Sequence, residues 1–434
     1  MGFIMLCKYE INDEVMCKEK AYKNHEYCIL HIELPNESDP SYPEIIKLKK
    51  EKIEKKLENS EKSVDGYDVF NFIGAKLDEI DLSGRKINGS LDFSDAYIKN
   101  DVILNNSEIF GDVFFARTKI GGFVYFENLA DCRSTSTKIH GDVIFFDSYM
   151  DRLSIGHSAV EGDVNFSYGT KIKVDAKIVN SNISGDVSFN EVRFGDNEEP
   201  FWGHVDFQRT KIGKSLLFEK SSVGFHANFY NINIKEKALF SDTIFYEKVD
   251  FRGVRIGGRT SFDNSKFKKQ AFFDGTKIEG QVSFDNTTFG SIKSQEDAYL
   301  MAKTVFNNLG DRIEADKYFF KEMVAKRKQK PFYIKYPELI IEYCFGYGVY
   351  PLRIIVTWLI VVFVFALIFW LGNGVQDANT IYSNIYFSVV TALTPGYGGF
   401  KPIGDYQLIA TIEAIFGTFM WAAFVATFAR KYMR

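Results

Sequence analysis

Four side chains near the start of the chain can bind a metal ion. They are Cys7, Cys17, Cys28 and His31, with nine, ten and two residues between them. Three thiolates and one imidazole suit a tetrahedral structural zinc site, and four protein ligands leave no open position for catalysis. His25 is an alternative ligand. Because three of the five cysteines lie in the first 28 residues, the pattern favours a metal site over a disulfide framework.

A second set of residues with a possible function is the run TPGYG, from Thr394 to Gly398. It lies between two apolar segments, Leu352 to Leu371 and Gln407 to Phe428, each about the ~20 residues that cross a bilayer. The short apolar stretch SNIYFSVVTAL comes directly before it and predicts a helix that re-enters the membrane. Irregular backbone at membrane depth is tolerated only where it is buried in protein or lines a wet cavity.

This arrangement resembles the pore of the potassium-channel family. Laid over the filter signature TVGYG, Thr394, Gly396, Tyr397 and Gly398 match in order, and Thr391 stands where the family's pore helix has a threonine. The resemblance implies a homotetramer, because carbonyl oxygens from four chains replace the ion's water shell. Gly396 and Gly398 adopt positive φ at no steric cost, which lets the backbone turn its carbonyls inward.

Two residues depart from the family pattern. Pro395 occupies the valine position, where it removes an N–H and fixes φ near −65°, and Gly399 stands where an aspartate is usual. We therefore expect a monovalent cation pore and leave potassium preference or non-selective permeation open. In the second span Gly417 is either a gating hinge or a site of close helix packing. Glu413 is an ionisable residue within the membrane, which we expect to support the back of the filter.

A repeat fills the region from about residue 64 to residue 290. Eight phenylalanines follow one another at intervals of eleven, and a second apolar series keeps the same interval five residues behind, beginning at Ile212. Only a solenoid holds such a register, because each turn stacks the same inward side chain on the last one. Between Phe126 and Phe207 the steps are irregular, with Phe145, Phe166 and Phe189 as the expected inward residues. The eight phenylalanines at intervals of eleven are Phe207, Phe218, Phe229, Phe240, Phe251, Phe262, Phe273 and Phe284.

Runs such as FDGTKIEGQVSFDNTTF resemble pentapeptide-repeat proteins. The resemblance implies a right-handed, four-sided β-helix, although the double unit has eleven residues where a strict member of that family has ten. If two units make one turn, we expect roughly ten turns and a length on the order of 50 Å. The Cys and His spacing is in turn similar to small Cys3His zinc modules, from which no function is transferred.

The segments between these regions are charged or basic. SYPEIIKLKKEKIEKKLENSEK reads as a helix or a plain linker. Residues 291–330 have apolar side chains at helical spacing around Gly310-Asp311, which predicts a helical hairpin that caps the solenoid. A second GYG at residues 346–348 precedes the membrane without a pore helix, so we interpret it as part of an interfacial elbow.

Charge and composition narrow the function classes. The net charge of −4 gives no reason to expect nucleic acid as a partner. No signal peptide is read at the start, and basic residues flank both spans, so we expect a multi-pass plasma-membrane protein with both termini in the cytoplasm. No nucleophile–base pair, phosphate loop or clustered histidines indicate an enzyme.

The leading hypothesis is a tetrameric cation channel, conducting potassium or another monovalent cation, whose β-helix regulates it through an unknown ligand or protein. The alternative is a membrane-anchored interaction or scaffold protein without ion conduction. The predicted organisation is a Cys3His module (1–40), charged helix or linker (41–63), β-helix (64–290), coupling hairpin (291–330), elbow (331–351), first span (352–371), pore helix and filter (380–399) and second span (407–430).

Overall fold

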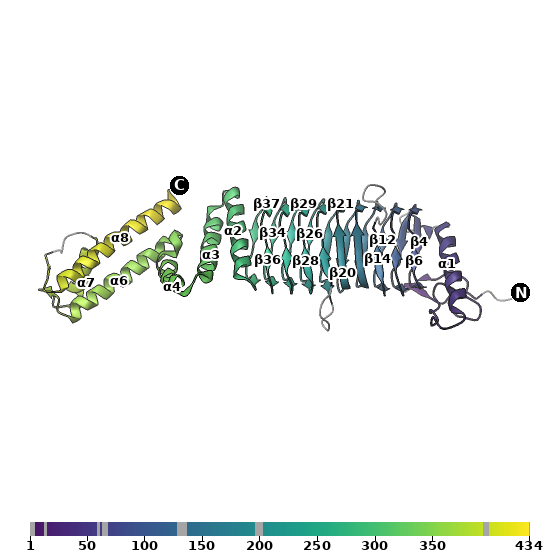
Figure 1. Ribbon diagram of the computed structural model, residues 1–434, viewed down its shortest axis with the longest axis horizontal. Helices are drawn as coiled ribbons and strands as arrows, with labels where there is room; N and C mark the ends of the chain where they lie inside the picture. Colours follow the sequence, from purple (N-terminus) through teal and green to yellow (C-terminus); the bar gives the residue numbers. More distant parts are fainter. Residues whose placement is uncertain are drawn as a thin grey trace. The chain divides into compact units, whose positions relative to one another are not determined.

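The structure, a computed structural model, describes residues 5–12, 15–58, 61–62, 68–127, 137–195, 203–393 and 399–433. The chain divides into two compact units, Met1–Asp311 and Arg312–Arg434. The first unit contains a parallel β-solenoid with small elements at its two ends, and the second is almost entirely helical (Figure 1). This confirms the predicted combination of a β-solenoid with an α-helical region that contains two apolar helices.

Four short strands make one regular turn of the solenoid. In the regular turns a strand pairs in parallel with the strand four places later, as β9 does with β13 and β10 with β14. The paired residues are 22 positions apart, as in Val102 with Val124, so two eleven-residue units make one turn. A larger step occurs where residues are inserted in the sequence, for example between Val113 and Val143. The nine-stranded sheet corresponds to about nine turns among the described residues, close to the expected ten.

The strands form three sheets, of which the largest covers two sides of the coil. One sheet contains β3 (Glu61–Lys62), β4 (Asp68–Asn71), β8 (Ser90–Asp92), β12 (Val113–Phe114), β16 (Val143–Phe146), β19 (Val164–Ser167), β22 (Val187–Asn190), β26 (Leu216–Leu217), β30 (Ala238–Leu239), β34 (Thr260–Ser261) and β38 (Val282–Ser283). The second contains β7 (Lys86–Ile87), β11 (Glu108–Ile109), β15 (Lys138–Ile139), β18 (Ala159–Val160), β21 (Asn182–Ile183), β25 (Lys211–Ile212), β29 (Asn233–Ile234), β33 (Arg255–Ile256) and β37 (Lys277–Ile278). The third contains β5 (Lys76–Leu77), β6 (Ile80–Asp81), β9 (Tyr97–Ile98), β10 (Val102–Ile103), β13 (Lys119–Ile120), β14 (Phe123–Tyr125), β17 (Tyr149–Gly156), β20 (Lys171–Val179), β23 (Arg193–Phe194), β24 (His204–Asp206), β27 (Ser222–Val223), β28 (His226–Asn228), β31 (Ile244–Phe245), β32 (Val249–Asp250), β35 (Lys266–Phe267), β36 (Ala271–Phe272) and β39 (Thr288–Phe289).

The phenylalanines form two stacks inside the coil. Rings 22 residues apart lie face to face, such as Phe229 and Phe251 with centroids 5.0 Å apart, or Phe240 and Phe262, also at 5.0 Å. Rings eleven residues apart belong to different stacks and meet edge to face, as Phe229 and Phe240 do at 78°. Both arrangements are favourable for aromatic pairs. The inward positions expected in the irregular part, Phe145, Phe166 and Phe189, are all fully buried.

Buried hydroxyls satisfy backbone groups at the corners. Thr118 Oγ1 donates to the Phe93 carbonyl at 2.8 Å, and Thr276 Oγ1 donates to the Phe251 carbonyl at 2.7 Å. A small hydroxyl side chain leaves room for the adjacent ring and replaces a hydrogen bond that the tight turn does not make. The repeat therefore needs both a large apolar and a small polar residue in each module.

The N-terminal elements lie on the first turn of the solenoid. They are β1 (Glu10–Asn12), β2 (Val15–Met16) and α1 (Tyr42–Glu58). The charged segment is thus a helix rather than a plain linker, with Lys49 and Ile53 buried. Arg85 holds Glu54 of α1 through two hydrogen bonds of 2.7 Å each, and the Lys76 N–H donates to the Leu30 carbonyl at 2.7 Å. These contacts cover a strand edge that would otherwise expose unpaired backbone groups.

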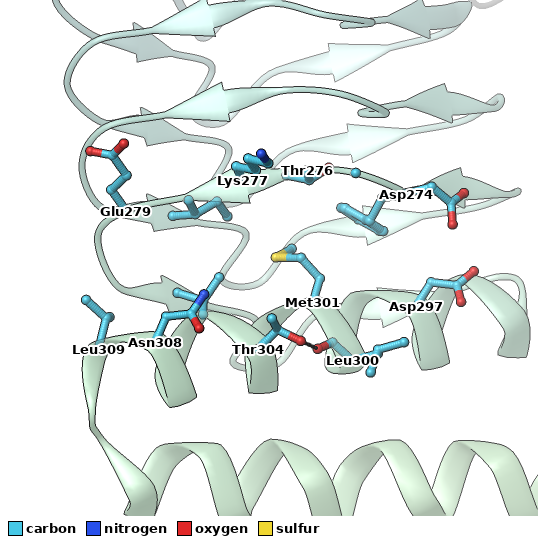
Figure 2. Close-up of a pocket in the computed structure, with 14 residues that line it drawn as sticks. Asp274, Thr276, Lys277, Glu279, Asp297, Leu300, Met301, Thr304, Asn308 and Leu309 are labelled. Atoms are coloured by element: carbon cyan, nitrogen blue, oxygen red, sulfur yellow. Dashed lines mark hydrogen bonds between the residues drawn. The ribbon is translucent and has the colours of Figure 1, made fainter.

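Helix α2 (Ile292–Leu309) closes the opposite end. Ser291 caps its first turn, and the Ser294 hydroxyl accepts the Ala271 N–H at 2.9 Å. A pocket of about 790 Å³ lies between α2 and the last turn, where Met301 extends from the helix toward the strands (Figure 2). Its rim carries Asp274 and Asp297. The helix ends at Gly310, whose φ of 76° is the left-handed conformation that glycine adopts without strain.

The second unit begins with α3 (Arg312–Gln329) and the short helices α4 (Phe332–Lys335) and α5 (Pro337–Ile340). The π-helical turn η1 (Ile341–Phe345) and the 3₁₀ turn η2 (Gly346–Gly348) follow. The remaining elements are α6 (Pro351–Leu371), β40 (Val375–Gln376), α7 (Ile381–Leu393), β41 (Lys401–Pro402) and α8 (Tyr406–Tyr432). Both α6 and α8 are long and apolar enough to cross a membrane, with mean hydropathies of 3.0 and 1.8.

Candidate metal centre and candidate pore

The fold brings the four predicted metal ligands together. The ligand atoms of Cys7, Cys17, Cys28 and His31 all lie within 4.8 Å of one another. His31 Nδ1 is 3.3 Å from Cys7 Sγ and 3.2 Å from Cys28 Sγ, and the sulfurs of Cys17 and Cys28 are 4.0 Å apart. Sulfur ligands at 2.3 Å from a tetrahedral zinc are about 3.8 Å from one another, so the donor set and its spacing fit this ion.

A second layer of contacts orients the histidine. His31 Nε2 donates to the Ile73 carbonyl at 2.9 Å, which leaves Nδ1 without a proton and directed at the sulfurs. Such a hydrogen bond to the non-ligating nitrogen is typical of metal-binding histidines. The Tyr9 ring stacks on the imidazole at 4.1 Å. The exposed His25 stacks on Tyr22 and does not belong to the cluster. His31, rather than His25, therefore lies with the three cysteines.

The charges around the cluster also suit a cation. The hydrogen bond from Cys17 lowers the pKa of Cys28 to about 3. The same bond and burial raise the pKa of Cys17, so a metal ion would displace the proton that the two sulfurs share. Burial lowers the pKa of Lys49 to about 7. Its ammonium donates to the carbonyls of Leu30 and Ile32, at 3.3 Å and 2.9 Å, which fixes the backbone around the ligands.

In the helical unit, α7 packs against both α6 and α8. Phe369, Val375, Ala378, Phe387 and Ala410 form a buried apolar cluster where the three helices meet. The antiparallel pair β40–β41 joins the segments on either side of α7. Two long helices with a short one held between them are the arrangement that the sequence predicts for a pore.

The five filter residues predicted from the sequence, Thr394 to Gly398, lie outside the described residues. Thr391, three positions before them in the chain, and Glu413, on the helix that follows, are described. Thr391 on α7 is 2% exposed and Glu413 on α8 is 1% exposed. Thr391 Oγ1 and Glu413 Oε2 have no hydrogen-bond partner within the described ranges. Unsatisfied polar atoms of this kind are costly at membrane depth.

Glu413 is held through a residue that sequence reasoning missed. The Ser388 hydroxyl of α7 contacts the Glu413 carboxyl group and lies 2.8 Å from the Val362 carbonyl of α6. One hydroxyl thus links all three helices. A buried serine in an apolar helix is a signal that points to such a contact, but the sequence does not show which residue it meets.

Gly417 is a point of close approach between α7 and α8. A Cβ atom added there would be 2.1 Å from the Ala392 carbonyl oxygen, a distance that side chains do not tolerate. The helix runs without interruption from Tyr406 to Tyr432. Close packing of α8 against α7 therefore explains why a glycine is needed at this position. Its use as a gating hinge stays a prediction.

Two family models match parts of the chain. Residues 353–434 match the family described as ion channel, and residues 240–288 match pentapeptide repeats, in 9 copies. No curated protein and no solved structure matches the chain. The two matches confirm the resemblances to a channel pore and to pentapeptide repeats, and neither family is enzymatic. The C-terminal part of the chain is therefore an ion-channel-like domain joined to a pentapeptide-repeat solenoid.

Proposed function

Starting from this ion-channel-like domain, we propose that the chain forms a homotetrameric channel for monovalent cations in the plasma membrane. The observation that carries the proposal is the α6–α7–α8 arrangement within the matched segment, with the TPGYG run directly after the short helix. One chain supplies a quarter of a carbonyl-lined filter, so four copies are needed around the ion. Basic residues before α6 and at the end of α8 support a cytoplasmic location for both termini.

The filter comprises Thr394, Pro395, Gly396, Tyr397 and Gly398. The polar atoms of Thr391 and Glu413 that lack a partner among the described residues support this proposal, since both need a partner and the two residues lie before and after this run in the chain. Thr391 belongs to the pore helix, and Glu413 supports the filter from behind. Pro395 alters the filter backbone at one position, where it removes an N–H. Tyr397 braces the strand from the side opposite the ions.

The filter proposal is tested by reversal potentials in mixed potassium and sodium solutions. We expect Pro395→Val to shift permeation toward potassium relative to the natural sequence, because valine restores a backbone N–H and a freer φ. An equal reversal potential in both proteins would remove the special role given to Pro395.

We further propose that Cys7, Cys17, Cys28 and His31 hold one structural zinc ion. A bound zinc would supply the cross-link that fixes the N-terminal elements on the first turn of the solenoid. Metal analysis of the purified chain should give about one zinc per chain, and Cys28→Ser should reduce this to near zero. Cys344→Ser, a change in the helical unit, is the matched control and should retain the metal. Absence of zinc from the natural protein would overturn the assignment.

A regulatory role for the solenoid completes the proposal. The solenoid is joined to the pore through α2 and α3, and its outward faces carry mixed charges that suit a ligand or protein partner. Removal of residues 1–290 should change the open probability of the channel while leaving its unitary conductance unaltered. An unchanged open probability would contradict regulation by the solenoid.

A further inference from the structure

Helix α3 contacts the cytoplasmic end of the second span. Arg430, in the last turn of α8, donates through Nη2 to Asp316 Oδ1 at 3.2 Å. Its guanidinium group also lies over the Phe319 ring, 5.3 Å from the centroid. One arginine therefore makes an ion pair and a cation–π contact with the same face of α3.

The same helix contacts the start of the first span. The Arg353 guanidinium lies 5.0 Å from the Phe320 centroid and 4.8 Å from that of Tyr350. Phe320 and Tyr350 meet edge to face at 5.2 Å. Asp316, Phe319 and Phe320 are three and four positions apart, so they lie on one face of α3.

A buried ion pair fixes the far end of α3. Arg327 Nε donates to Glu342 Oε2 at 2.7 Å, and both residues are less than a tenth exposed. Arg353 in turn donates to the Glu342 carbonyl at 3.0 Å. The α3 helix, the η1 turn and the start of α6 are thereby held as one piece.

Helix α2, in contrast, is fixed on the solenoid. Ala298, Ala302, Val305 and Phe306 are buried, and the Ser294 hydroxyl holds the edge strand. The chain passes from α2 to α3 through Gly310 and Asp311, which is where the two compact units divide. Along the chain, these two residues are the covalent link between the solenoid and the unit that contains the spans.

We propose that α3 is the element that transmits the state of the solenoid to the gate, and that the Asp316–Arg430 pair positions the cytoplasmic end of α8. The proposal rests on the proposed channel function. The side chains of Arg430 and Asp316 are 43% and 28% exposed. A partly exposed pair contributes little free energy, so it can break and re-form during gating. Asp316 and Arg430 are positioning residues and do not contact the permeant ion.

The test is a charge exchange in the full-length channel. Asp316→Asn and Arg430→Gln should each shift the closed-to-open equilibrium in the same direction, by about two- to fivefold per subunit, as expected for such a pair. The double variant Asp316→Arg with Arg430→Asp should restore the natural open probability. Unitary conductance and reversal potential should not change in any of them. Lys317→Gln, which removes the neighbouring pair with Glu314 and the contact with the Tyr318 ring, is the control and should gate normally.

Two outcomes would overturn the proposal. One is a natural open probability in both single variants at normal surface expression, and the other is a charge exchange that fails to restore gating. A chain that conducts no ions would instead contradict the proposed channel function. The contact itself is then tested without current, by joining Asp316→Cys and Arg430→Cys with a short thiol cross-linker and identifying the linked peptides by mass spectrometry. No linked peptide would again count against the pair.

Discussion

The solenoid and the membrane unit distribute their side chains in opposite ways. The solenoid buries the phenylalanines of its two stacks and exposes charged residues such as Lys211 and Glu161. The membrane unit exposes Leu352 and Ile415, at 69% and 67%, and buries Ser388 and Glu413. Each unit presents the groups that its surroundings can solvate, water in the first case and lipid tails in the second.

The two units also differ in how they treat buried polar groups. In the solenoid these are mostly hydroxyls, and many of them donate to a backbone carbonyl of the coil, as Thr118 does to Phe93. In the membrane unit the buried set includes a carboxyl group with one oxygen still unpartnered in the described part of the chain. The bonded hydroxyls of the first unit serve the fold, whereas a buried ionisable group in the second unit supports the proposed site there.

The largest expected effect is the loss of one ring from the solenoid stack. Phe145 is fully buried between Phe115 and Phe166, whereas its neighbour Phe146 is 39% exposed. Phe145→Ala should lower the free energy of unfolding by about 3–5 kcal/mol, because it removes transfer energy and leaves a cavity. Phe146→Ala should cost much less. Denaturant titration followed by circular dichroism measures both, and equal effects would contradict the assigned core.

The next effect concerns the buried ion pair of the second unit. Glu342→Gln leaves the Arg327 guanidinium without its counter-charge at a site where both side chains are about a tenth exposed. We expect a loss of roughly 3 kcal/mol in the free energy of unfolding in detergent. Lys330→Gln, which breaks the more exposed pair with Glu338, is the control. A loss as small as that of the control would show that this pair is solvated.

A smaller effect is expected from the hydroxyl that joins the three membrane helices. Ser388→Ala removes the contact with Glu413 and should cost about 1–3 kcal/mol, since it leaves a buried polar group unsatisfied. Thr418→Ala, which removes an exposed hydroxyl from α8, is the matched control. Thermal stability of the detergent-solubilised protein separates the two. Equal melting temperatures would mean that Glu413 finds another partner.

The smallest effect belongs to the solenoid surface. Lys269 and Glu247 form a pair at 2.7 Å, with side chains 55% and 37% exposed. Lys269→Gln should change the free energy of unfolding by less than ~1 kcal/mol, because the pair is screened by water. A larger loss in the same titration would show that surface charges, rather than stacked rings, stabilise the coil.

The sequence predicts the period of the solenoid but not the partners of its rings. Phe229 and Phe240 are one eleven-residue unit apart, which is half a turn, so they stand in different stacks. The number of strands per turn decides which rings share a stack, and that number depends on how the chain folds at the corners. Insertions in the sequence similarly change the step from 22 to larger values, and Phe145 and Phe189 are still fully buried.

For the candidate sites, too, the sequence predicts the residue types but not all of their contacts. The ligand set of the metal centre follows from residue type and spacing, because thiolates and imidazole have few other uses in that combination. The carbonyl of Ile73 that orients His31 is 42 positions away and became visible only in the fold. Ser388 and Glu413, 25 positions apart, are likewise joined by helix packing. Long-range contacts between unlike elements leave no period in a sequence.

The most direct test of the central claim is ion flux through the purified chain in liposomes. With potassium inside and a sodium-free impermeant cation outside, the account predicts potassium efflux that protein-free liposomes do not show. The experiment is repeated with sodium in place of potassium. A non-selective pore should then give a similar efflux of sodium, and a potassium-selective pore a much smaller one. No monovalent cation flux in either condition from correctly folded protein would contradict the claim that α6, α7 and α8 form a pore.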